Sequence, residues 1–87
     1  MLLAIICLSC TGYLERDARH LAMFQKQREK IIKMILRIDD PLQLNRYRQD
    51  LLVVTTKYKS YKNEMKMKYN NDEDWARFQE AYGKALE

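Results

Sequence analysis

The chain has 87 residues, with 16 Lys or Arg against 12 Asp or Glu and a formal net charge of +4. This length has room for a single domain with a small core. The basic excess suits an acidic or anionic surface, but it falls short of the bias expected of a dedicated nucleic-acid-binding protein. Only two glycines and one proline interrupt the chain, which favours a few long helices.

Charge is divided unevenly along the chain. Residues 14–69 hold 14 basic and 7 acidic side chains, whereas residues 70–87 hold 2 basic and 5 acidic ones. The body is therefore basic and the tail acidic. The two parts can attract each other within one molecule or between molecules, although an exposed ion pair contributes only about 0 to 1 kcal/mol.

The chain opens with an apolar run from Leu2 to Leu8, followed by Ser9 and Cys10. A secretory leader has an apolar core of roughly 7 to 15 residues and small residues at its cleavage site. A membrane span needs about 20 consecutive apolar residues, so this run is too short to cross a bilayer. We therefore expect residues 1–9 either to be removed as a signal peptide or to pack on the helices that follow.

The tripeptide Leu8-Ser9-Cys10 resembles the signal of bacterial lipoproteins, in which a protease cuts before a cysteine whose sulfur carries a diacylglycerol. The resemblance implies that Cys10 is lipidated and that residues 10–13 form a tether. It also implies a location in the bacterial cell envelope, facing the periplasm or the exterior. Two or more acyl chains hold a protein stably on a membrane, because each buried methylene contributes about 0.8 kcal/mol. In the alternative, Cys7 and Cys10 are small buried hydrophobic residues.

A first helix is predicted over residues 14–38. Apolar residues recur there at steps of three and four, which is the spacing of one helical face. These residues are Leu14, Ala18, Leu21, Phe24, Ile31, Ile35 and Ile38. Arg28 lies on the same face, where we expect it either to extend outward with its stem buried or to pair with a carboxylate.

A second helix is predicted over residues 41–69. Pro41 suits its first position because the missing N–H has no partner there, and Asp40 is the expected N-cap. This helix has the strongest periodicity in the chain, again at steps of three and four. Its apolar positions are Leu44, Tyr47, Leu51, Val54, Tyr58, Tyr61 and Met65.

A third helix is predicted over residues 73–86, with Asp72 as its cap and an apolar face that includes Trp75 and Phe78. The expected fold class is all-α: an antiparallel hairpin of two long helices with a short third helix, forming a small three-helix bundle. At about 1.5 Å per residue the third helix covers only half of the hairpin. Part of one apolar stripe is then left exposed, which predicts a protein partner or a homo-oligomer.

No convergent set of catalytic or metal-binding residues is found in the sequence. We therefore expect no enzyme activity, no metal and no cofactor. His20 is the only histidine, and we expect it to be exposed in a charged helical turn. Cys7 and Cys10 have C-x-x-C spacing, but neither a second cysteine pair nor a βαβ pattern accompanies them.

Two groups of residues are candidates for binding. The first is a largely aromatic set that either forms a docking groove for a partner or belongs to the core: Tyr47, Tyr58, Tyr61, Met65, Trp75, Phe78 and Tyr82. The second is a set of lysines that either contact an anionic surface or bind nucleic acid: Lys57, Lys59, Lys62, Lys66 and Lys68. The helical register places the tyrosines on the buried stripe, which favours core packing over base stacking.

The sequence thus leads to one main hypothesis and two alternatives. The main hypothesis is a small membrane-anchored helical lipoprotein that acts as a non-catalytic adaptor or assembly factor in a bacterial envelope complex. The alternatives are a basic helical module that binds nucleic acid and a self-associating structural protein.

Overall fold

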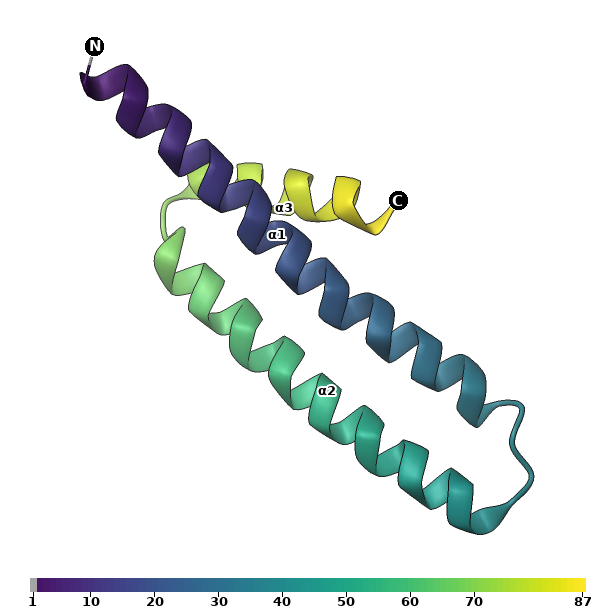
Figure 1. The fold of residues 1–87 in the computed structure, drawn as a ribbon. Coiled ribbons are helices and arrows are strands. Elements are labelled where there is room, and N and C mark those ends of the chain that lie inside the picture. The colour runs from purple at the N-terminus through teal and green to yellow at the C-terminus, as the bar shows by residue number, and fades with distance from the viewer. Residues whose placement is uncertain (1) are drawn as a thin grey trace.

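A computed structural model describes the backbone of residues 2–87 and the side chains of residues 12–87. Three helices follow one another along the chain: α1 (Leu2–Ile35), α2 (Pro41–Lys68) and α3 (Asp72–Leu86). The described residues contain no strand. Figure 1 shows α1 and α2 as an antiparallel hairpin and α3 as a shorter helix beside α1. The predicted all-α bundle of two long helices and a short third one is confirmed.

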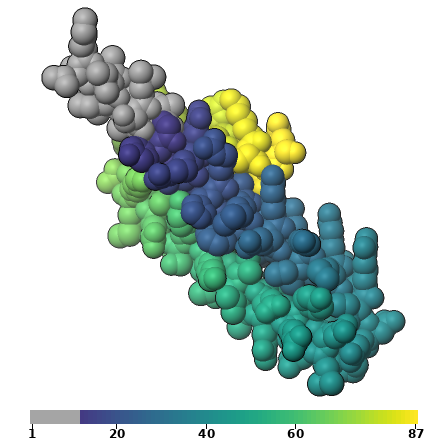
Figure 2. All heavy atoms as spheres, in the orientation of Figure 1, coloured from purple at the N-terminus to yellow at the C-terminus, as the bar shows by residue number. Residues whose placement is uncertain are grey.

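The first helix holds the fold together, because α1 packs against both α2 and α3. The molecule is elongated, with extents of 60 × 23 × 18 Å. In Figure 2 the yellow atoms of α3 lie beside one part of the hairpin, and the teal end that holds the α1–α2 turn extends well beyond them. One half of the hairpin is therefore a three-helix bundle and the other half a helix pair.

The bounds of α1 differ from the prediction at both ends. Its backbone is helical from Leu2, so residues 10–13, expected to be a tether, are part of the helix. It ends at Ile35 rather than at residue 38, because Leu36 and Arg37 turn the chain before α2. A helix extended to residue 38 would leave only two residues for that reversal. The predicted signal peptide, residues 1–9, and the side chain of Cys10 lie outside the described side chains, and those predictions stay predictions.

The start of α2 is as predicted. Asp40 is its N-cap, and its side-chain Oδ1 accepts a hydrogen bond from the backbone N–H of Leu42 at 3.1 Å. Pro41 occupies the first helical position, where it leaves no donor unsatisfied. The Asp-Pro pair therefore fixes where the second helix begins.

The cap of α3 is Asn71 and not the predicted Asp72. Asn71 has an extended backbone (φ −97°, ψ 155°), and its side-chain Oδ1 accepts a hydrogen bond from the N–H of Asp74 at 2.8 Å. Asp72 already belongs to the first turn, together with Glu73 and Asp74. Negative charge in that turn interacts favourably with the helix dipole, so these three acidic residues stabilise α3.

The core lies where all three helices meet. Its buried hydrophobic residues are Leu14, Ala18, Leu21, Met65, Tyr69 and Phe78. Phe78 of α3 is 1% exposed, and its ring stacks on Trp75 at 5.3 Å and on Tyr69 at 5.4 Å between centroids. Burying such a side chain contributes about 1.5–3 kcal/mol. Phe78 is therefore the main attachment of α3 to the hairpin.

The other half of the hairpin has no comparable core. No residue between Met23 and Glu64 is buried. Leu36 and Leu42, on either side of the α1–α2 turn, are 80% and 82% exposed. Apolar side chains therefore remain open to solvent where α3 does not reach.

Candidate functional site

Asp17 is the buried charged residue of the described core, with 5% of its surface exposed. It lies on α1 and accepts three hydrogen bonds from α2 and the residue that follows it. Lys68 Nζ and the Tyr69 hydroxyl donate to Oδ2 at 2.7 and 2.8 Å, and the Tyr61 hydroxyl donates to Oδ1 at 3.3 Å. These four side chains are called the Asp17 cluster below.

The electrostatics of the Asp17 cluster favour an ionised carboxylate and neutral phenols. Burial acts to raise the pKa of Asp17, but hydrogen bonds from Lys68 and Tyr69, the positive charge of Lys68 and the bond from Tyr61 together hold that pKa below its ordinary value of 3.8. Burial and the negative charge of Asp17 raise the pKa of Tyr61 to about 12. The same two causes raise the pKa of Tyr69 as well. At neutral pH the phenols therefore stay protonated and act as donors.

Two further side chains border the Asp17 cluster on its solvent side. The Arg16 guanidinium lies 3.9 Å from Asp17 Oδ1 and 4.7 Å from the centroid of the Tyr13 ring. Lys68 Nζ lies 6.0 Å from the same ring. Tyr13 is 52% exposed. The Asp17 cluster thus links α1 to the end of α2 through hydrogen bonds.

A second polar link joins α1 to α2 farther along the hairpin. Arg28 Nε donates to Thr55 Oγ1 at 3.0 Å, and its Nη1 donates to Gln25 Oε1 at 2.8 Å. The guanidinium carbon lies 5.3 Å from the centroid of the Tyr58 ring. Arg28 therefore bonds to a hydroxyl and an amide, and no carboxylate of the described residues, α3 included, forms an ion pair with it.

The structure brings most of the predicted aromatic set together, but inside the bundle. Met65 and Phe78 are buried, and four more side chains are half-buried and pack against the core: Tyr58, Tyr61, Trp75 and Tyr82. The hydroxyls of Tyr58 and Tyr82 lie 3.2 Å apart and link α2 to α3. Tyr47 is half-buried near the start of α2, away from the others. A docking role for this set stays a prediction that would require the bundle to open.

The five candidate lysines do not form one surface. At about 3.6 residues per turn, Lys59, Lys62 and Lys66 lie on one flank of α2, and Lys57 and Lys68 lie on the opposite flank. All are exposed except Lys62, which is half-buried. Lys68 is also engaged in the Asp17 cluster. This division does not favour the interleaved Lys-Tyr segment as a nucleic-acid-binding platform.

Asp17 is the site residue that sequence reasoning missed. It lies three residues after Leu14 and four before Leu21, so it shares the apolar face of α1 with them. That position was the available signal. Its neighbour His20 is exposed, as expected, and its ring lies 5.8 Å from Phe24 and 5.3 Å from Tyr61 between centroids.

Two kinds of site are absent from the described residues. No three His, Cys, Asp or Glu side chains among them are placed to hold a metal ion. None of their helices combines the length and the apolar character needed to span a bilayer.

No protein-family model matches the chain, and no curated protein and no solved structure matches it either.

Proposed function

We propose that the protein is a small bacterial lipoprotein, anchored through Cys10, whose helical bundle acts as a non-catalytic adaptor or assembly factor in the cell envelope. The observation that carries the proposal is the division of the chain at Cys10. The apolar run from Leu2 to Leu8 precedes it, and the first buried residue of the described core, Leu14, follows four positions later. Cleavage before Cys10 would thus leave every buried residue of that core in place.

The arrangement of the bundle gives the two ends different roles in this proposal. The Asp17 cluster and the hydrophobic core include Leu14 and Asp17, in the part of α1 that follows Cys10, so the best-packed part of the bundle adjoins the anchor. The far end presents the exposed Leu36 and Leu42. With 28 residues, α2 is about 42 Å long, so the turn would lie well away from the membrane. Exposed apolar side chains of this kind suit contact with a protein partner.

The chemistry of the core supports a binding role rather than catalysis. The carboxylate of Asp17 is held ionised by three donors, and the pKa values of Tyr61 and Tyr69 are raised. A general acid or base works best with a pKa near the working pH and within reach of a substrate. These groups meet neither condition, because Asp17 and Tyr69 are buried, Tyr61 is half-buried, and the two phenols donate to the carboxylate.

The test is to express the full chain in a bacterium and compare wild type, Cys10→Ala and Cys7→Ala. Fractionation and the mass of the mature N-terminus are the two measurements. We expect wild type and Cys7→Ala to begin at Cys10, to carry acyl chains and to enter the membrane fraction. We expect Cys10→Ala to keep its leader and to carry no acyl chain.

The Cys7→Ala variant is the matched control, because it removes a thiol from the same segment on the other side of the expected cleavage point. A wild-type protein that still begins with Met1 and carries an unmodified Cys10 would contradict the proposal. So would a Cys10→Ala variant with the same acylation and distribution as wild type.

A further inference from the structure

A row of exposed cations runs along α1. Arg19, Lys26 and Lys33 are spaced seven residues apart, and all three are exposed. Seven residues are almost two helical turns, so their side chains leave the helix along one line at intervals of about 10.5 Å. None of the three forms an ion pair with another described residue. These three residues are called the basic stripe.

A row of exposed carboxylates with the same spacing runs along α3 to its C-cap. Glu73, Glu80 and Glu87 are also seven residues apart and exposed, and they are called the acidic stripe. Glu73 pairs with Arg77 at 2.9 Å and Glu80 with Lys84 at 3.4 Å, both within α3. Exposed pairs of this kind contribute only about 0.3–0.5 kcal/mol, so they exchange readily for other partners. No ion pair among the described residues joins the two stripes.

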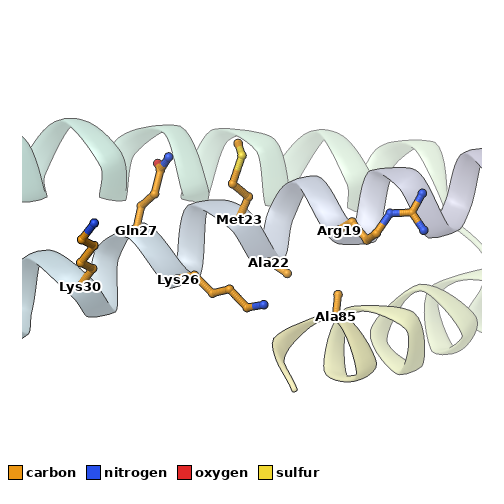
Figure 3. A pocket seen from close by; sticks show the side chains of 7 residues that line it. All are labelled: Arg19, Ala22, Met23, Lys26, Gln27, Lys30 and Ala85. Atoms are coloured by element: carbon orange, nitrogen blue, oxygen red, sulfur yellow. The ribbon is translucent and has the colours of Figure 1, made fainter.

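A shallow apolar groove lies beside the basic stripe, where α3 ends against α1. It has a volume of about 460 Å³. Its floor includes Ala22 and Met23 of α1 and Ala85 of α3, and Met23 is 42% exposed. Figure 3 shows Lys26 extending beside this floor toward the end of α3. The groove therefore offers an apolar contact area bordered by positive charge.

We propose that the occupant of this surface is a second copy of the chain, with the acidic stripe of each molecule lying along the basic stripe of the other. The argument is charge complementarity with matched spacing: three cations on α1 and three carboxylates on α3 and its C-cap repeat every seven residues in one molecule. A twofold axis then generates two identical contacts, because each molecule supplies one stripe of each sign. Met23 and its neighbours supply the apolar part of the interface, and the charges fix its register. This dimer does not depend on the lipid anchor.

The test is the oligomeric state of the full chain in a neutral detergent, measured by sedimentation at several concentrations and two salt concentrations. One variant reverses the basic stripe (Arg19→Glu, Lys26→Glu, Lys33→Glu). The other reverses the acidic stripe (Glu73→Lys, Glu80→Lys, Glu87→Lys). We expect wild type to dimerise, more weakly at high salt. We expect each variant alone to be monomeric and the equimolar mixture to form a dimer, because both contacts are again complementary.

The matched control makes the same change of charge at the far end of the hairpin, with Arg37→Glu, Arg46→Glu and Arg48→Glu. We expect this variant to dimerise like wild type. Circular dichroism checks that each variant folds. If the variant with the reversed basic stripe does not fold, a neutral variant carries Gln in place of Arg19, Lys26 and Lys33. The neutral variant should weaken dimerisation by about tenfold or more, which corresponds to about 1.4 kcal/mol. A monomeric wild type, or a mixture that stays monomeric while each variant is folded, would overturn the proposal.

Discussion

Asp17 is a charged side chain that the fold keeps inside its core. A buried carboxylate is costly unless it is hydrogen-bonded and paired, and here it receives bonds from Tyr61, Lys68 and Tyr69. The three donors lie 44 to 52 residues farther along the chain. The Asp17 cluster therefore forms only when α1 and α2 pair in the native register, and its hydrogen bonds stabilise that register over others.

Replacing the carboxylate tests this role. We expect Asp17→Asn to lower the free energy of unfolding by about 1–3 kcal/mol, the range for a buried hydrogen-bonded group that loses its partners. Lys68 is half-exposed, so water can solvate its ammonium in the variant and limit the loss. Urea unfolding followed by Trp75 fluorescence measures the change. Asp50→Asn, at an exposed position on α2, is the matched control and should have little effect.

The pH dependence of the same two variants gives a second measurement. Folding lowers the pKa of Asp17 below 3.8, so the folded state binds this proton more weakly than the unfolded state. The resulting stability is fully present above about pH 4 and is lost as the pH falls through the lowered value. Wild type should therefore lose stability below pH 4, and Asp17→Asn should lose less. An identical acid dependence in both proteins would show that Asp17 is not the group responsible.

The apolar periodicity predicted most of the core but not this residue. Leu14, Leu21 and Met65 follow the helical spacing and are buried. Asp17 falls on the same face, yet a charge near the start of a helix is equally consistent with solvent. Only its hydrogen-bond donors decide between burial and exposure, and they lie 44 to 52 residues farther along the chain. Local sequence therefore could not reveal the Asp17 cluster, whereas it did reveal the hydrophobic residues around it.

Among the elements, α3 depends most on its own cap. It has 15 residues, a length at which an isolated helix is only marginally stable in water. Its attachment combines Phe78 in the core with the Asn71 side chain at its start. We expect Asn71→Ala to lower stability by about 1 kcal/mol, with the loss visible in Trp75 fluorescence. Asn70→Ala changes the preceding residue, which does not cap the helix, and a comparable loss there would contradict this role for Asn71.

The helix bounds show which local signals were sufficient. Asp40 and Pro41 fixed the start of α2, because proline restricts the preceding residue and fits the first helical position. At the start of α3 both Asn71 and Asp72 are good capping residues, so composition alone did not determine which one adopts the extended backbone. The end of α1 was placed three residues too late, since Ile38 continues its apolar pattern although the chain has already turned.

The whole molecule consists of two parts with different packing. Among the described side chains, all buried residues lie within residues 14–22 or 65–78, where α3 completes the bundle. Between them side chains such as Ile31 and Leu51 are only half-buried, and the hydrogen bond from Arg28 to Thr55 joins the two long helices. Local stability follows the density of buried contacts. The two parts are therefore expected to open separately, although they share the same two helices.

Hydrogen exchange measures this division directly. We expect backbone amides of α2 within residues 45–52 to exchange about tenfold faster or more than those within residues 61–68, a difference of about 1.4 kcal/mol in local opening. Residues 45–52 begin at the fifth residue of α2 and residues 61–68 reach its last residue, so fraying at the helix ends does not by itself favour faster exchange in residues 45–52. The physical cause is the core cluster around Phe78, which includes Met65 of the second segment and no residue of the first. In Phe78→Ala, which should cost about 3–5 kcal/mol, the slower segment should approach the faster one. Equal protection of the two segments in wild type would mean that the hairpin is uniformly stable and that α3 does not determine which part opens first.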